Sequence, residues 1–388
     1  MSNARSKDTF LRFTHLRLEN WRNFTCIELD LQRRAFFVGP NAAGKSNLLD
    51  VFRFLHDVVS VGGGFREAVT TRGGVSSIRA LAARRYPEVA IRVRIGTDDD
   101  LARWTYELRF KQDNRSRPII QTETVHKGEQ EIVARPYAED TADPERLTQT
   151  YLEQVHANRE FREIADFFTS VHYLHIVPQL IREPDRSVGH TNDPFGGDLL
   201  EQIARINKRT RQAWLRQICK ALRIAVPQLQ ELKLEQDPRG TPHLYCKYEH
   251  WRHQGAWQTE ERLSDGTLRL LGLLWITLRS SGPLLLEEPE LSLHPEVVRY
   301  IPQMFARMQR RTGRQILLST HARDLLQDEG IGLDEVLLLE PGKEGTQVRP
   351  ASKLDEVRAL LEGGVPLSEA VMPQTNPSTA DQLALFGE

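Results

Sequence analysis

Alternation of apolar and polar residues is the first pattern in this chain. It runs through Phe13–Leu18 and Thr25–Leu31, and the residues between them (20–23) are typical of a turn. It returns over residues 89–95, 103–110 and 119–126, again with turn residues between the segments. Alternation with a period of two predicts half-buried strands, and short turns between them favour antiparallel pairing. The first third of the chain is therefore predicted to form an antiparallel hairpin and meander.

A second pattern consists of short, continuously apolar runs at residues 35–38, 283–286, 315–319 and 335–339. Such runs are typical of strands buried on both faces, as in parallel sheets. Helical periodicity is predicted for residues 47–55, 143–168, 199–223, 267–278 and 295–310, and further strands for 171–177, 229–235 and 243–251. A loop region with short helical pieces is predicted for residues 60–83, a loop for 178–194 and a loose tail after Gly363. The fold class is therefore predicted to be α/β, with an antiparallel subsheet and an inserted helical lobe.

We expect four segments along the chain. They are an N-terminal lobe (1–135), a helical insert (136–255), a C-terminal lobe (256–350) and a tail (351–388).

The segment between the first apolar run and its helix carries the clearest chemistry. It reads Gly39-Pro40-Asn41-Ala42-Ala43-Gly44-Lys45-Ser46 and fits the pattern G-x-x-x-x-G-K-[ST]. Strand, glycine-rich loop and helix form the context in which backbone N–H groups surround phosphates. Lys45 would reach the β- and γ-phosphates and Ser46 would ligate Mg²⁺, with Asn47 next to them. The sequence therefore predicts a binding site for a nucleoside triphosphate and Mg²⁺.

Three later segments have residues suited to the same chemistry. The apolar run 283–286 ends in Glu287 and Glu288, two acids suited to metal binding and to activating water. Ser264 and Gly266 precede the helix 267–278, where they form either an ordinary N-cap or a second anion site. His321 follows the run 315–319 and is suited to contact a γ-phosphate.

Composition limits the remaining alternatives. The chain has 388 residues and a formal net charge of −1, so no overall positive field draws it to nucleic acid or membrane. No apolar run approaches the ~18 residues of a membrane span, and no signal peptide is visible. Its three cysteines are far apart in sequence, which favours reduced thiols over disulfides or zinc. We therefore expect a cytoplasmic protein without membrane contact.

Taken in order, the segments 39–46, 263–266, 284–288 and 319–321 resemble the Walker A, signature, Walker B and switch-histidine motifs of ABC-type ATPases. Within that class, residues 16–24 (LRLENWRNF) and 287–295 (EEPELSLHP) resemble the AAA_21/AAA_15 branch, which is related to RecF, OLD and SMC-head ATPases. The resemblance covers roughly residues 11–340.

The resemblance implies a homodimer, or a higher oligomer, in which ATP lies between the Walker A loop of one copy and Ser264 and Gly266 of the other. It also implies that Glu287 holds the metal, Glu288 is the general base and His321 senses the γ-phosphate. Two departures from the family pattern stand out. Glu287 occupies a position where Asp is usual, and no glutamine is assigned to a Q-loop.

The same resemblance implies an ATPase that regulates a protein effector, a nuclease or toxin, in anti-phage defence. Two alternatives stay open: a RecF-like DNA-repair ATPase, and a nucleotide-dependent scaffold with negligible hydrolysis. One pattern independent of the resemblance bears on DNA. Basic residues recur along one stripe of the predicted helix 199–223, where they form either a phosphate-binding surface or a solvated face: Arg205, Arg209, Arg216, Lys220 and Arg223.

Overall fold

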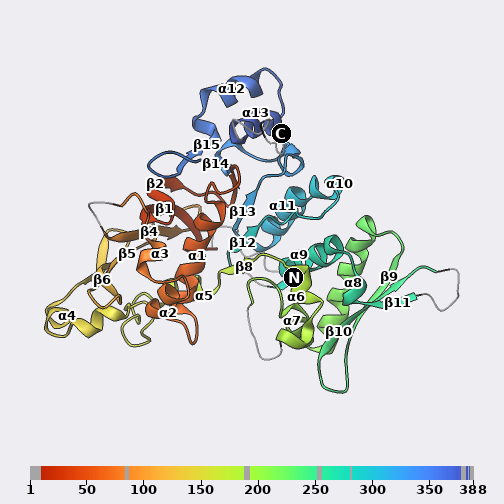
Figure 1. The fold of residues 1–388 in the computed structure, drawn as a ribbon, viewed down its shortest axis with the longest axis horizontal. Coiled ribbons are helices and arrows are strands. Elements are labelled where there is room, and N and C mark those ends of the chain that lie inside the picture. Colours follow the sequence, from red (N-terminus) through yellow and green to blue (C-terminus); the bar gives the residue numbers. More distant parts are fainter. Residues whose placement is uncertain are drawn as a thin grey trace. The chain divides into compact units, whose positions relative to one another are not determined.

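The computed structural model describes residues 10–83, 87–187, 193–250, 256–279 and 282–376, together with residues 382 and 384. The chain forms two compact units (Figure 1). Unit 1 comprises Met1–His172, Ser281–Leu285 and Phe305–Glu388, and unit 2 comprises Tyr173–Ser280 and Leu286–Met304. Among the described residues, no helix combines the length and the apolar composition that a membrane crossing needs. The four segments expected from the sequence stay a prediction.

The first sheet of unit 1 is antiparallel and has the strand order β2-β1-β4-β5-β6-β7. Trp21 pairs with Phe24 across the tight turn that joins the first two strands, and Arg22 has a φ of 54° in that turn. The predicted hairpin and meander are confirmed, and a further strand, β7, extends the sheet. The strands are β1 (Arg12–Trp21), β2 (Phe24–Asp30), β4 (Val89–Gly96), β5 (Trp104–Gln112), β6 (Pro118–Lys127) and β7 (Gln130–Arg135).

The second sheet has the order β15-β14-β3-β13-β12-β8. Both β13 and β14 run parallel to β3, whereas β15 is antiparallel to β14. Every residue of β3 and β13 is buried, which explains their continuously apolar sequences. The strands are β3 (Arg34–Val38), β8 (His172–Leu174), β12 (Leu284–Glu287), β13 (Ile316–Thr320), β14 (Val336–Glu340) and β15 (Gln347–Pro350).

Helix α1 (Lys45–Val59) joins the two sheets of unit 1 into one core. Its Phe52 ring lies 4.7 Å from Phe13 of β1, and its Phe54 ring 5.4 Å from Trp21. The same helix contacts β13 of the second sheet. The phosphate loop therefore leads into a helix that contacts both sheets of this unit. Other helices assigned to unit 1 are α2 (Phe65–Thr70), α3 (Val75–Ile78), α4 (Ala138–Ala142), α5 (Arg162–Thr169), α12 (Asp355–Glu362) and α13 (Leu367–Val371).

Two predictions for this unit were wrong. The predicted helix 143–168 is reduced to a 3₁₀ turn over Pro144–Thr148 and to α5, because the buried Glu123 carboxylate accepts the N–H groups of Tyr151 and Leu152. The tail after Gly363 was predicted to be loose, yet α13 buries Ala370 and Val371. Alternation and composition carry no information on such tertiary contacts.

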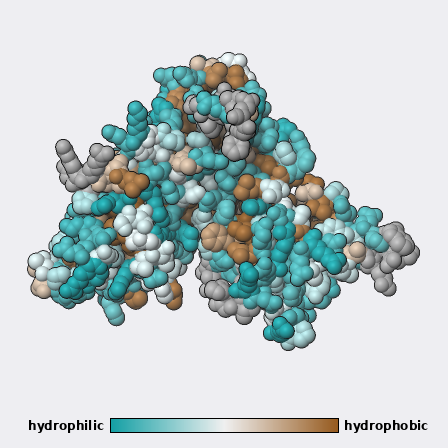
Figure 2. Space-filling view, viewed as in Figure 1, coloured by the Kyte–Doolittle hydropathy of each residue, from teal (hydrophilic) through white to brown (hydrophobic). Residues whose placement is uncertain are grey.

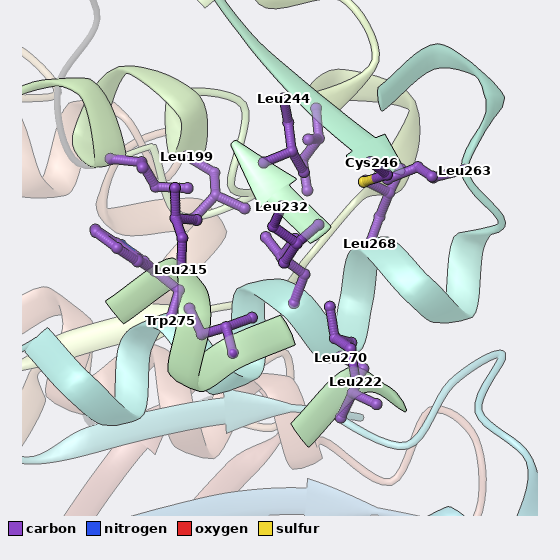
Figure 3. Packing of buried hydrophobic residues seen from close by; sticks show 14 of the residues in the cluster. Leu199, Leu215, Leu222, Leu232, Leu244, Cys246, Leu263, Leu268, Leu270 and Trp275 are labelled. Atoms are coloured by element: carbon purple, nitrogen blue, oxygen red, sulfur yellow. The ribbon is translucent and has the colours of Figure 1, made fainter. Parts of the chain in front are cut away.

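Unit 2 has its own apolar core, formed by its helices and by a three-stranded sheet of order β11-β10-β9 (Figure 3). Leu215 and Leu222 of α8 pack there with Leu232, Leu244 and Trp275. The elements assigned to this unit are α6 (Pro178–Ile181), α7 (Leu199–Ala204), α8 (Lys208–Ala225), β9 (Leu229–Gln236), β10 (Pro242–Tyr248), β11 (Ala256–Thr259), α9 (Asp265–Arg279) and α10 (Pro295–Val298).

Two helices predicted as continuous are broken. The predicted helix 199–223 divides into α7 and α8, because Asn207 is extended and its side chain accepts the N–H of Thr210 at 2.9 Å as the N-cap of α8. The predicted helix 295–310 divides into α10 and α11 (Ile301–Thr312), where Pro302 cannot donate to a preceding turn. Arg205 therefore lies outside the helix that carries the rest of the basic stripe.

A buried ionic cluster fixes the segment after β7 in unit 1. Arg135 has a fully buried side chain and donates to Glu123 at 2.9 Å and to Asp140 at 3.0 Å. Next to this cluster, Glu153 accepts the N–H groups of Phe65 and Thr150. Burial raises the pKa of Glu153 to about 7.

This pKa predicts a pH-dependent stability. The folded state binds a proton at Glu153 that the unfolded state releases near pH 4.3, so the free energy of unfolding should fall between about pH 4.5 and 7. One titrating proton limits this slope to about 1.4 kcal/mol per pH unit, and the partial exposure of Glu153 makes the total change smaller. Glu153→Gln should flatten this slope in urea unfolding at pH 5–8. The exposed Glu129→Gln is the control, and parallel curves for wild type and Glu153→Gln would contradict the prediction.

Candidate functional site

The phosphate loop runs without a break from the end of β3 to the first turn of α1. Ala42 and Gly44 have φ angles of 63° and 94°, both in the left-handed region. Alternating left- and right-handed residues turn successive N–H groups toward one concave side, a geometry that binds anions. The start of a helix adds partial positive charge at the same place. The loop predicted from the sequence therefore has the backbone of an anion cradle.

Both glycines of the loop are required by close approaches. A Cβ atom at Gly39 would lie 2.7 Å from the carbonyl oxygen of Leu339 on β14. A Cβ atom at Gly44 would lie 2.1 Å from Nδ2 of Asn23. The neighbouring strand and the hairpin turn thus hold the loop from two sides.

Asn23 is the residue that sequence reasoning missed. Its Nδ2 donates to the carbonyl of Ala43 at 2.9 Å and to Oγ1 of Thr346 at 2.7 Å, and its Oδ1 accepts from Asn47 at 2.8 Å. Asn23 thereby ties the β1–β2 turn to the second half of the loop and to the start of α1. Its only signal in the sequence was its place in the segment 16–24, which carries the family resemblance but does not indicate what Asn23 does.

Lys45 and Ser46 have contrasting environments. The Lys45 side chain is buried, and its Nζ donates to the carbonyls of Gly39 at 2.8 Å and Pro40 at 3.1 Å. Its ammonium group therefore lies inside the loop, where it can exchange carbonyl oxygens for phosphate oxygens. Ser46 is exposed at the start of α1. These residues fit a triphosphate whose Mg²⁺ takes the Ser46 hydroxyl as a ligand.

The parallel register of β13 with β3 brings His321 to the same edge of the sheet. Thr320 pairs with Val38, so His321, which follows β13, and Gly39, which follows β3, lie at the same end of the sheet. Ser319 and Thr320 are buried, whereas His321 is exposed. The structure therefore brings the phosphate loop and His321 together within unit 1.

The predicted acids belong to unit 2. The hydroxyl of Tyr173 donates to Oε2 of Glu287, and the main-chain oxygen of Glu287 lies 3.4 Å from Nδ1 of His175. Glu288 follows with a φ of 42°, so the chain turns sharply directly after the strand. Tyr173 was also missed, since 113 residues separate it from Glu287 in the sequence. It orients the carboxylate at the predicted metal position.

The segment of Ser264 and Gly266 packs against the loop that follows Glu288, also within unit 2. Ser264 Oγ accepts the N–H of Thr267 at 3.2 Å, so its side chain caps α9. A Cβ atom at Gly266 would lie 2.5 Å from the carbonyl oxygen of Ser292, whose φ is 61°. The N-cap alternative is thus realised for the side chain, and Ser264 remains exposed. Its contact with a nucleotide of another copy stays a prediction.

Arg269 lies one turn farther along α9. Burial lowers the pKa of its guanidinium, and the carboxylates of Asp265, Glu288 and Glu290 oppose that shift. The predicted general base, Glu288, therefore interacts electrostatically with a cation of its own unit. Among the described residues, no group of three or more His, Cys, Asp or Glu side chains is arranged to hold a metal. A Mg²⁺ ion would thus depend on phosphate oxygens as well as on protein ligands.

Comparison with known proteins gives a family and a fold. Over residues 34–326 the chain matches AAA_21, described as "AAA domain, putative AbiEii toxin, Type IV TA system". No curated protein matches the chain.

Similar solved structures are SMC heads. An SMC head bound to the C-terminal winged-helix domain of ScpA is 13% identical, with 87% of this chain and 97% of that chain covered and a TM-score of 0.52. An SMC head from Pyrococcus furiosus with an extended coiled coil, bound to the C-terminal domain of ScpA, is 11% identical (91% and 99% covered, TM-score 0.51). One from Pyrococcus yayanosii, with a coiled coil and joint, is 10% identical (92% and 100%, TM-score 0.50).

At these identities the likeness shows the fold, and it confirms the predicted α/β P-loop architecture of the ABC-ATPase head type. The family match extends from β3 through the phosphate loop, Ser264, Glu287 and His321, so it includes all four segments on which the resemblance was based. The chain belongs to the AAA_21 family, and its fold is similar to that of the SMC heads.

Proposed function

We propose that this chain is a Mg²⁺-dependent ATP hydrolase that dimerises around ATP and thereby controls a protein effector. The observation that carries the proposal is the parallel register of β3 and β13, with the phosphate loop and His321 at one edge. A γ-phosphate held by the loop would lie beside an exposed imidazole. This arrangement suits an ATPase that distinguishes ATP from ADP.

The residues of unit 1 would bind the nucleotide. The loop N–H groups and Lys45 would neutralise the phosphates, and the Ser46 hydroxyl would ligate the metal, which spreads the charge that develops on the transferred phosphoryl group. His321 would donate a hydrogen bond to the γ-phosphate. Asn23 would keep the loop in its binding geometry whether or not nucleotide is present.

The acidic and signature residues of unit 2 have roles of their own in this proposal. Glu288 would accept the proton of the attacking water, and Glu287, oriented by Tyr173, would hold the metal position. Ser264 and Gly266 would bind the phosphates of the nucleotide carried by a second copy. The exposure of Ser264 and the glycine requirement at 266 support this role.

An effector partner and a role in anti-phage defence are supported by the family description, which refers to a toxin and to a type IV toxin–antitoxin system. The described SMC heads bind domains of ScpA, so a protein partner is compatible with this fold. Direct DNA binding, as in the RecF-like alternative, has its support in the exposed basic residues of α8. The scaffold alternative predicts nucleotide binding without turnover.

Replacing the predicted base tests the catalytic proposal. Glu288→Gln should reduce ATP turnover at least about 100-fold, because general-base catalysis contributes roughly 10²–10⁴. ATP affinity should be retained, and light scattering should show the mass doubling with Mg-ATP. Lys45→Ala should lose both ATP binding and the dimer.

Glu329→Gln, an exposed acid of unit 1, is the matched control. Wild-type turnover in Glu288→Gln would show that the base is another residue. A monomer with bound ATP would exclude the dimer mechanism. Absence of turnover in wild type with normal ATP binding would favour the scaffold.

Removing one hydroxyl tests how Glu287 is oriented. Tyr173→Phe deletes the hydrogen bond to the Glu287 carboxylate and leaves the ring. Loss of an outer contact to a metal ligand weakens metal binding about tenfold. We therefore expect the Mg²⁺ concentration for half-maximal turnover to rise about tenfold, while ATP affinity in EDTA stays unchanged. The control is Tyr300→Phe, an exposed tyrosine, and an unchanged Mg²⁺ dependence in Tyr173→Phe would show that the contact is structural only.

A further inference from the structure

A groove lies between α8 and β9, two consecutive elements of unit 2. It has a volume of about 1040 Å³, and its walls are the basic helix and the strand at the edge of the three-stranded sheet. The predicted ATPase chemistry uses none of its residues. A groove of this volume is large enough for an extended segment of several residues.

The edge of β9 is open along the groove. Leu244 of β10 donates its N–H to the Glu260 carboxylate, so its backbone faces away from β9. Leu234 stands directly opposite Leu244, and by antiparallel geometry its N–H and C=O point away from β10, toward the free edge. Among the described residues, no strand pairs with this edge. Unpaired main-chain groups of this kind are a template for an added strand.

Helix α8 covers only the beginning of that edge. Arg223 donates to the main-chain oxygens of Leu229 and Gln230, and Cys219 to that of Gln230. The helix and the strand run in opposite directions, because only residues 226–228 connect them. Earlier turns of the helix, with Arg216 and Gln212, therefore line the part of the groove where the edge is open.

The helix wall is strongly cationic. All six charged residues of α8 are basic. Its first turn holds no acidic residue, although the helix dipole disfavours positive charge there. Lys208, Arg216 and Lys220 line the groove, are exposed and make no ion pair with any described residue. These charges are not used for internal pairing, which points to an anionic ligand.

The floor and the opposite wall indicate which anion. Leu215, Leu232 and Leu234 give the groove an apolar floor that suits side chains of a peptide. The β9 wall carries Glu231 and Glu235, so the acidic groups of a ligand must face α8 and not β9. The open strand edge and the apolar floor favour a polypeptide over DNA or RNA.

We propose that the groove binds an extended acidic segment of a partner protein, which adds a strand to β9 at residues 233–236. Its main chain pairs with the free groups of Leu234, and alternate carboxylates reach Arg216, Lys220 and Lys208. This inference assigns a surface to the partner of the proposed function. The binding itself needs neither ATP nor dimerisation, so the two proposals can fail separately.

The experiment uses the full chain without nucleotide and a fluorescein-labelled peptide, Thr-Glu-Val-Glu-Thr-Glu-Val-Glu-Thr, followed by fluorescence anisotropy. We expect saturable binding that weakens on replacing the peptide's Glu by Gln. A central-Pro peptide, in which Pro replaces the central Thr and one neighbouring Glu, keeps three of the four Glu residues but cannot pair with the edge. It should bind at least about tenfold more weakly, the equivalent of one or two lost hydrogen bonds.

Protein variants locate the site. Arg216→Ala combined with Lys220→Ala should weaken peptide binding about tenfold or more, on the scale of charge-assisted hydrogen bonds. The matched control is Arg209→Ala, an exposed α8 residue outside the groove lining. Lys45→Ala should bind the peptide like wild type, which separates this result from any failure of the ATPase proposal.

Three outcomes would overturn the inference. In the first, the central-Pro peptide binds as tightly as the original peptide. In the second, Arg209→Ala weakens peptide binding as much as the double variant does. In the third, a 20-nucleotide single-stranded DNA binds and the peptide does not at the same salt concentration. The last outcome would assign the groove to nucleic acid instead.

Discussion

The parallel pairing of β3 with β13 and β14 is the constraint on which the candidate site depends. It places the residue after Val38 beside the residue after Thr320, so a phosphate loop and an imidazole leave the sheet at one edge. It also brings Leu339 of β14 so close to Gly39 that only glycine fits there. Because these strands are buried on both faces, the register is set by packing that a one-residue shift would destroy.

The sequence was informative wherever a local pattern and a local function coincide. The phosphate loop, its strand and its helix lie within about 25 residues, so the local pattern was enough to predict them. The buried strands were predicted from their continuous apolar runs. Asn23 and Tyr173 were missed because their roles depend on contacts with residues far away along the chain, Thr346 and Glu287. The break at Asn207 was a local signal, an N-cap residue inside a helical pattern, that the longer amphipathic periodicity concealed.

The two units differ in where their charged side chains lie. In unit 1, Arg135 and its carboxylate partners are fully buried, so removing one partner would leave an uncompensated charge. In unit 2, the charges of α8 are on the surface, and Figure 2 shows a mainly hydrophilic face with hydrophobic residues in small groups. The first arrangement fixes a fold, whereas the second leaves charge available to a ligand.

Helix α8 would be a poor helix by itself, since basic residues occupy its first turn and no carboxylate offsets them. Its stability must come from the opposite face, where Leu215, Ile218, Cys219 and Leu222 are buried in the core of unit 2 (Figure 3). Each fully buried aliphatic side chain contributes roughly 1.5–3 kcal/mol, well above the 0.3–1 kcal/mol of an unfavourable dipole contact. The apolar face therefore stabilises the helix, and its stability does not depend on the exposed basic side chains. Replacing Arg216 and Lys220 by alanine should then leave the fold intact, which makes these variants a test of recognition and not of stability.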